Sequence, residues 1–221
     1  WKVIYTSTAK KKIKNLKKNK DLYGIKIDFN NENSLSDLSK ELEDRKLLVN
    51  HLVNNARSLS SLKVDKDGLA NRENFVKEFI MDVFVPYNLS MLLFKKQKKD
   101  LKTITNISSQ YSLVAANPII YDNHLIESPI QYGVSKSALN HLTRELAVRF
   151  SKSKIRVNCI AYGGLKGRVS KEFEKKYSKL NPMGRMLKNS DVAGPLDYLV
   201  SESSSFITGQ VISVDGGWTI W

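Results

Sequence analysis

The sequence has little cysteine, little histidine and no long apolar segment. Cys159 is the single cysteine of 221 residues, and there are three dispersed histidines. One cysteine excludes an internal disulfide framework, and no charged-then-apolar leader precedes the first strand-like segment, so a cytoplasmic protein is expected. The apolar runs are short and broken by polar residues, well below the roughly 20 residues that a membrane span needs. We therefore expect no membrane partner and no metal centre.

Charge is unbalanced toward lysine and arginine. The chain has 36 Lys and Arg against 22 Asp and Glu, a formal net charge of +14. Such a surplus attracts phosphates, so nucleic-acid binding has to be considered. The densest basic cluster alternates with Ile13 and Leu16 at helical spacing, which a solvated helix face explains equally well; its members are Lys10, Lys11, Lys12, Lys14, Lys17, Lys18 and Lys20. Because no RNA-binding aromatic signature accompanies it, no nucleic-acid partner is predicted.

Strand-like and helix-like patterns alternate along the whole chain. Short β-branched runs predict strands at 3–5, 25–28, 49–53, 103–107, 155–160 and 211–214. Apolar residues at helical spacing predict helices at 35–42, 75–87, 132–150 and 191–200, whereas 110–131 is a long irregular stretch and 171–188 a polar, basic one. Alternation of this kind is typical of an α/β fold with a parallel, doubly wound, Rossmann-like sheet. Forty-one per cent hydrophobic residues suffice for one core, so residues 1–221 are predicted to form a single domain.

A tyrosine and a lysine four residues apart offer acid–base chemistry. On a helix, Tyr132 and Lys136 share one face, where the ammonium can stabilise a phenolate. A free tyrosine ionises near pH 10, too high for a base at neutral pH, so a fixed cation is required. The same spacing recurs at Tyr162 and Lys166, but Gly163 and Gly164 between them indicate a loop without a common face. The spacing alone is therefore weak evidence.

Polar residues at predicted strand ends strengthen the first pair. Ser108 and Ser109 follow one strand, and Asn54-Asn55-Ala56 ends another. Ligands of open α/β sheets bind at the carboxyl ends of the strands, so these residues are expected near a ligand. Each also has a structural explanation: Ser109 can cap a strand end, and the two asparagines can satisfy backbone groups at a turn.

Taken together, these motifs resemble the short-chain dehydrogenase/reductase family. The resemblance rests on Asn54-Asn55-Ala56, on Tyr132-Gly133-Val134-Ser135-Lys136, and on the segment from Thr208-Gly209 to Gly217, in this order and spacing. It implies an NADP- or NAD-dependent oxidoreductase. Tyr132 would be the general acid/base, Lys136 would favour its ionised form and hold the nicotinamide ribose, and Ser109 would orient the substrate carbonyl.

The resemblance also implies a cofactor site. Besides Tyr132 and Lys136, its residues would be Asp28, Asn54, Asn55, Ala56 and Gly163. Asp28 ends a predicted strand, where it is either a helix cap or an adenine-side contact. Thr6 and Ser7 stand where an NAD-preferring carboxylate is expected, with Lys10 to Lys12 close by, so NADP is slightly favoured over NAD.

Residues 110–131 resemble an insertion of the flagellin-modification and bacterial sugar-biosynthesis branch. Tyr111, Asn117-Pro118 and Tyr121 carry this resemblance, which implies a small-molecule substrate such as a nucleotide-linked or phosphorylated amino sugar.

The helices of this family that pair across two-fold axes correspond to 79–93 and 139–150. Both have surplus apolar residues, so a homodimer or homotetramer is expected, with the tail 218–221 at or near a subunit contact. Alternatively, the tail folds onto its own subunit.

The sequence also departs from the family pattern. The glycine-rich turn that holds the cofactor pyrophosphate is not in these 221 residues, so we expect the sequence to be an amino-terminally truncated fragment that lacks the first strand. The alternative is a genuine gap, which would cripple the cofactor site. Asp82 stands where the family usually has the Asn of its proton relay, Arg57 replaces a Gly, and Tyr162 replaces a Pro. These departures leave an alternative function, a non-catalytic relative that binds a sugar nucleotide or a protein partner. Cys159, His51 and His124 are expected to be structural.

Overall fold

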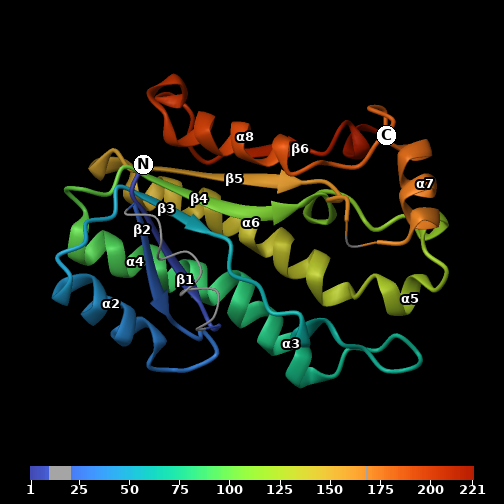
Figure 1. The fold of residues 1–221 in the computed structure, drawn as a ribbon, viewed down its shortest axis with the longest axis horizontal. Helices are drawn as coiled ribbons and strands as arrows, with labels where there is room; N and C mark the ends of the chain where they lie inside the picture. The colour runs from blue at the N-terminus through green and yellow to red at the C-terminus, as the bar shows by residue number, and fades with distance from the viewer. Residues whose placement is uncertain (10–20, 168) are drawn as a thin grey trace.

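The computed structural model describes residues 1–9, 21–167 and 169–221. The basic cluster of residues 10–20 lies outside this part, and so does the proposed contribution of Lys10 to Lys12 to cofactor preference. The strands are β1 (Val3–Ser7), β2 (Leu22–Lys26), β3 (His51–Asn54), β4 (Thr103–Ser109), β5 (Arg156–Tyr162) and β6 (Val211–Val214) (Figure 1). The helices are α2 (Ser34–Asp44), α3 (Arg72–Phe79), α4 (Val85–Gln97), α5 (His124–Glu127), α6 (Ile130–Phe150), α7 (Lys171–Leu180) and α8 (Ser190–Val200). All six predicted strands are present, each within a few residues of its expected bounds.

Every strand pair in the described residues is parallel. β3, β4, β5 and β6 pair in that order, and β1 pairs with β2 in a second, two-stranded sheet. This confirms the Rossmann-like α/β prediction and adds one detail: no described strand connects β1 or β2 to β3 by hydrogen bonds, so the six strands form two sheets. The carboxyl ends of β3, β4 and β5 therefore lie at one edge, where a ligand site is expected.

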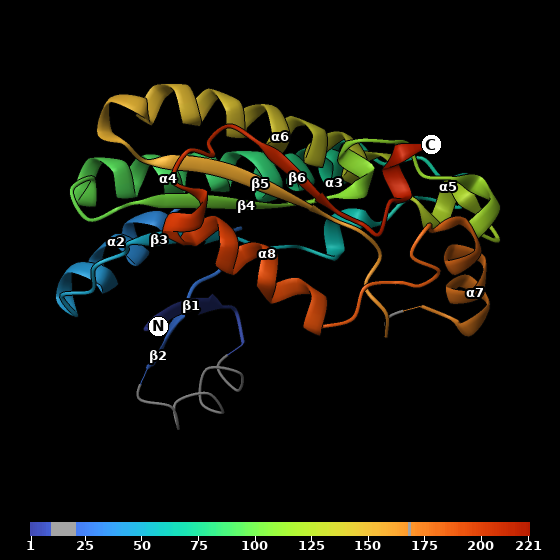
Figure 2. The same cartoon turned by 90° about the horizontal axis from the view of Figure 1, so that it is seen from above.

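Helices cover both faces of the four-stranded sheet. Figure 2 shows α4 and α6 on one side and α8 on the other. Helix α2 lies beside α4, to which the Lys96–Glu43 ion pair joins it. Ile104 in β4 and Val157 and Ile160 in β5 are completely buried between these layers. Strands buried on both faces often read as apolar runs, which explains why β5 was recognisable in the sequence. The buried positions of β4 are mostly polar, and its β-branched residues indicated the strand instead.

Helix α6 presents Tyr132 and Lys136 from its first two turns. It begins at Ile130, directly after Pro129 and two residues before the predicted start. Leu139, Leu146 and Phe150 are buried on its core face, as their spacing predicted. The packing of this long face fixes the rotation of the helix, and with it the direction of the side chains near its amino end.

The predicted helix at 75–87 is interrupted by a π-helical turn. Ile80–Phe84 connects α3 to α4 and contains the buried Asp82. Single π turns inside helices are rare and occur often at functional sites. The apolar spacing did not reveal this turn, because a one-residue widening hardly changes a helical pattern.

Two helices were missed in the sequence, the four-residue α5 within 110–131 and the longer α7. The polar stretch at 171–188 begins as α7, whose N-cap Ser170 accepts a hydrogen bond from the Phe173 amide. Its only buried residue is Tyr177, which stacks on Trp218 with 4.2 Å between ring centroids. Trp218 is therefore buried within its own chain, whereas Ile220 and Trp221 at the end of the tail are exposed.

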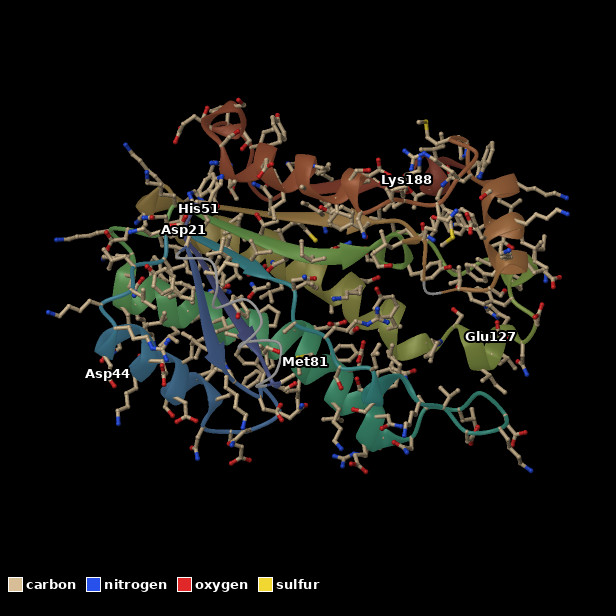
Figure 3. All side chains as sticks on the ribbon, viewed as in Figure 1. Asp21, Asp44, His51, Met81, Glu127 and Lys188 are labelled. Carbon is tan, nitrogen blue, oxygen red and sulfur yellow. The ribbon has the colours of Figure 1, made fainter. Side chains whose placement is uncertain are left out.

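Side chains are distributed over the whole fold (Figure 3). Within the described residues, no helix is long and apolar enough to cross a membrane. In the same part of the chain, no cluster of three His, Cys, Asp or Glu side chains could hold a metal ion.

Candidate active site

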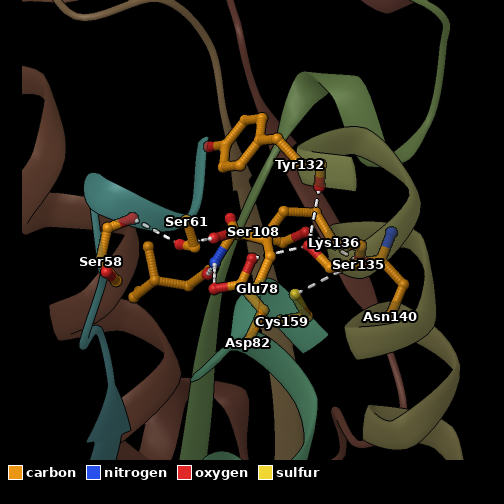
Figure 4. Close-up of polar contacts among 11 residues, drawn as sticks. Ser58, Ser61, Glu78, Asp82, Ser108, Tyr132, Ser135, Lys136, Asn140 and Cys159 are labelled. Carbon is orange, nitrogen blue, oxygen red and sulfur yellow. Dashed lines mark hydrogen bonds and ion pairs between the residues drawn. The ribbon is translucent and has the colours of Figure 1, made fainter. Parts of the chain in front are cut away.

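Lys136 is anchored at the carboxyl end of β4. Its ammonium lies 2.9 Å from Asp82 Oδ1 and donates to the Ile107 carbonyl oxygen at 3.1 Å. The other oxygen of Asp82 accepts from the Ser135 hydroxyl at 2.9 Å (Figure 4). The side chains of Lys136 and Asp82 are 8% and 1% exposed, so the pair is screened from water and held by hydrogen bonds at both partners.

Tyr132 lies one turn before Lys136 and contacts two cations. Arg57, in the turn after β3, has its guanidinium carbon 4.9 Å from the centre of the Tyr132 ring. Lys136 Nζ is 5.9 Å from the same centre. Both distances are within the range of cation–π attraction. Gly133 lets this part of α6 approach the segment after β4, because a Cβ there would lie 3.0 Å from the Tyr111 carbonyl oxygen.

Glu78 is a second buried carboxyl group beside this pair. It lies one turn before Asp82 and is 1% exposed. One oxygen is hydrogen-bonded to the Ser61 hydroxyl, while Oε1 is buried without a partner among the described residues. Burial, together with the charge of Asp82, raises the pKa of Glu78 above its ordinary value. The sequence reasoning missed Glu78, although its four-residue spacing from Asp82 on a predicted helix was visible.

Ser109 ends β4 and therefore lies at the same edge of the sheet. Its hydroxyl accepts a hydrogen bond from the Tyr111 amide at 3.2 Å, so the strand-end cap exists alongside any catalytic role. Asn54, at the end of β3, donates to Asn106 Oδ1 at 2.7 Å, and Asn106 donates to Thr143 in α6. These buried amides tie β3, β4 and α6 together. The donor of Asn54 thus binds a neighbouring strand's side chain and not the backbone groups of a turn, which was the structural role expected for it.

The remaining predicted cofactor residues are more dispersed. Asn55 and Ala56 are exposed in the turn after β3. Asp28 follows β2 and accepts from the amide and the side chain of Asn30, so it caps a turn and not a helix. Gly163 follows β5 and closely approaches the residue after β6, because a Cβ there would lie 2.8 Å from the Cα atom of Asp215.

The second Tyr–Lys spacing behaves as a chance match. The Tyr162 hydroxyl donates to the Val192 carbonyl oxygen at 2.6 Å, and Lys166 forms an ion pair with Glu174. The two side chains thus have separate partners, as the intervening glycines predicted.

Cys159 is completely buried, and burial raises the pKa of its thiol to about 12, which fits its expected place in the core.

Residues 110–131 fold into short turns beside the site. They contain single 3-10 turns at Gln110–Ser112 and Pro118–Ile120, then α5. The hydroxyls of Tyr111 and Tyr121 are 2.5 Å apart, and Tyr121 packs edge-on against Phe173 of α7. Burial raises the pKa of Tyr111, so that hydroxyl stays neutral. The insertion and α7 thus form one packed unit next to the strand ends.

Comparison with known proteins identifies the family. The family model described as enoyl-(acyl carrier protein) reductase matches residues 1–219. The post-translational flagellin modification protein A of Campylobacter coli is 30% identical over 207 residues, which cover 90% of this chain and 78% of that protein. A 3-oxoacyl-(acyl-carrier-protein) reductase of Buchnera aphidicola is 28% identical over 222 residues, covering 97% of this chain and 86% of that protein.

A solved structure supports the same assignment. The short-chain dehydrogenase of Leptospira borgpetersenii with bound NAD+ superposes with a TM-score of 0.87 at 28% identity, covering 99% of this chain and 83% of that one. These likenesses confirm the expected family and the NAD(P)-dependent oxidoreductase class. The chain belongs to the short-chain dehydrogenase/reductase family.

Proposed function

We propose that the protein transfers hydride at a carbinol or carbonyl carbon of a small sugar or amino-sugar derivative, in the cytoplasmic synthesis of a cell-surface or flagellin glycan. Two observations support this substrate class. The flagellin modification protein is similar over 90% of the chain. The insertion at 110–131 packs against α7 beside the strand ends, where the non-reacting part of a substrate can be bound.

One observation carries the assignment of the reacting groups. Tyr132 and Lys136 occupy successive turns of α6, and Lys136 is fixed to the end of β4 through the Ile107 carbonyl oxygen. Ser109 ends that strand two residues later. A phenol, an ammonium and a hydroxyl are thereby collected at the carboxyl edge of a parallel sheet, where this fold binds its ligands.

The donor and acceptor set fits a nicotinamide dinucleotide. An ammonium has three N–H donors, and Lys136 uses two of them, on Asp82 and Ile107, so one is left for a ribose hydroxyl. Asn54 Oδ1 is buried without a partner among the described residues and can accept one more hydrogen bond. Tyr132, Lys136, Asn54, Asn55, Ala56, Gly163 and Asp28 are the residues proposed to hold NADP or NAD.

Tyr132 moves the proton in the proposed reaction. The bound cofactor supplies or accepts the hydride. The Tyr132 hydroxyl has no hydrogen-bond partner among the described residues, so it is available to a substrate oxygen. In reduction, the phenol gives its proton to the carbonyl oxygen; in oxidation, the phenolate removes the carbinol proton. Ser109 donates to the same oxygen, and Lys136 is positioned by Asp82.

The substrate class is tested by turnover of a panel in the complete protein. Nucleotide-linked and phosphorylated amino sugars are compared with a 3-oxoacyl thioester, each with both dinucleotides, by following the absorbance of the reduced nicotinamide. We expect the highest kcat/KM for an amino-sugar derivative. Turnover confined to the thioester would overturn the sugar assignment and leave the oxidoreductase class intact.

A further inference from the structure

The two cations near Tyr132 are in different electrostatic states. Lys136 is paired with Asp82 at 2.9 Å in a buried site, so its positive charge is largely offset by the carboxylate. Both oxygens of Asp82 accept hydrogen bonds, one from Lys136 and one from Ser135. Seen from the Tyr132 ring, the lysine and the aspartate together therefore act as a nearly neutral pair.

Arg57 is not offset in this way. Among the described residues its guanidinium has no ion pair and no hydrogen bond, and it lies over the face of the Tyr132 ring. It is also nearer to the ring centre than Lys136, at 4.9 Å against 5.9 Å. A guanidinium remains charged at every pH that a protein tolerates, so this positive charge is permanent.

We propose that Arg57 is the cation that stabilises the Tyr132 phenolate in this protein. Its positive charge replaces that of Lys136, which the carboxylate of Asp82 offsets. This inference rests on the proposed acid–base role of Tyr132. A cation over an aromatic ring is attracted to its electron-rich face, and the attraction increases when the ring carries the charge of a phenolate. Arg57 thus favours the ionised form, although its exposure to water weakens the effect.

The charge count around the ring supports this compensation. The titratable groups that surround Tyr132 come from α6, from the turn after β3, from the α3–α4 segment and from the turn after β4; they are Lys136, Arg57, Glu78, Asp82 and Tyr111. Burial raises the pKa values of Glu78 and Tyr111, which favours their neutral forms. Lys136 and Asp82 cancel, so Arg57 supplies the remaining positive charge.

The opposite charges of Arg57 and Asp82 allow a double-variant test. Arg57→Gln removes a positive charge and Asp82→Asn a negative one, so the two single changes should act in opposite directions and the double change should nearly cancel. For oxidation by the complete protein, kcat should rise with pH, and Arg57→Gln should move this rise to higher pH by about one unit. That is the lower end of the pKa shift that a nearby opposite charge produces. Asp82→Asn should move it downward, and Arg57→Lys should restore part of the wild-type position. Arg45→Gln removes an exposed positive charge elsewhere and should leave the profile unchanged.

A second readout needs no substrate. The ultraviolet phenolate signal that Tyr132→Phe lacks is followed during alkaline titration of the wild type and of Arg57→Gln. It should appear at higher pH in Arg57→Gln. An unchanged titration would overturn the inference even if no substrate were turned over, whereas loss of activity in Tyr132→Phe tests the proposed function separately. If Arg57→Gln raised KM without moving the pH profile, Arg57 would be a substrate contact, and the inference would be wrong.

Discussion

The Asp82 carboxylate and the Lys136 ammonium form a buried ion pair, 2.9 Å apart, between the π turn and helix α6. The pair joins two elements that are 54 residues apart in sequence. It also fixes the ammonium next to Tyr132. The position of a group proposed to act in catalysis thus depends on a local irregularity of another helix.

Removing the carboxylate should destabilise the fold strongly. Asp82→Ala leaves the Lys136 charge buried without its partner, which typically costs about 3–5 kcal/mol. Glu43→Ala is the control, because Glu43 and Lys96 form an ion pair with both side chains 57% exposed. Exposed pairs contribute about 0–1 kcal/mol. Urea unfolding measures both variants, and equal losses would show that the Asp82–Lys136 pair is not effectively buried.

Glu78 should make the folded state less stable as the pH rises. Burial raises its pKa above the ordinary value of 4.5, so above about pH 4.5 the unfolded chain loses this proton while the folded chain keeps it. The unfolding free energy therefore falls with increasing pH until the raised pKa is passed. Glu78→Gln removes this decline. Its stability relative to wild type should increase between pH 5 and pH 8, by about 1.4 kcal/mol for each pH unit over which only the folded chain keeps the proton.

Glu73→Gln is a matched control on the same helix. Glu73 is exposed, and its hydrogen bond with Lys77 lowers its pKa. Its contribution is present above its ordinary pKa and is lost as the pH falls. Chemical denaturation at several pH values should show a relative stability of Glu73→Gln that does not increase over the same range. The same trend in both variants would contradict the account of Glu78.

Self-association should depend on the apolar surface of α4 and α6. Phe84 is 55% exposed beside α4, and Val148 is 75% exposed on α6. We expect a homodimer or homotetramer, and Phe84→Asp should shift it toward monomer because a charge is costly inside an interface. Light scattering at micromolar concentration measures this. Phe206→Asp, at a fully exposed position outside these helices, should leave the mass unchanged; a monomeric wild type would contradict the prediction.

NADPH should bind more tightly than NADH. β1 ends with Thr6 and Ser7, neither of which carries a negative charge that repels the additional phosphate. Thr6→Asp should reverse the preference by at least about tenfold, since hydrogen bonds to charged groups contribute about 1.5–3 kcal/mol. Fluorescence titration with each dinucleotide measures the ratio. A wild type that prefers NADH would show that the expected preference for NADP is wrong.

The sequence was most informative where apolar spacing determines the structure. Leu139, Leu146 and Phe150 indicated both the helix and the orientation of the end that carries Tyr132 and Lys136. The sequence was less informative about α7, because Tyr177 is the single buried residue of that helix. It was also less informative about the π turn, which leaves the apolar spacing nearly unchanged. The contact of Arg57 with Tyr132 joins residues 75 positions apart, and no local pattern records such a contact.

Turnover and dinucleotide binding in Tyr132→Phe test the central claim most directly. Loss of the phenolic proton should reduce kcat by about 10²–10⁴-fold, while the Kd values for NADH and NADPH stay near those of the wild type. Tyr198→Phe, an exposed tyrosine of α8, should retain full turnover. Unchanged turnover in Tyr132→Phe would contradict the assigned acid–base role, and a wild type that binds neither dinucleotide would instead support the non-catalytic alternative.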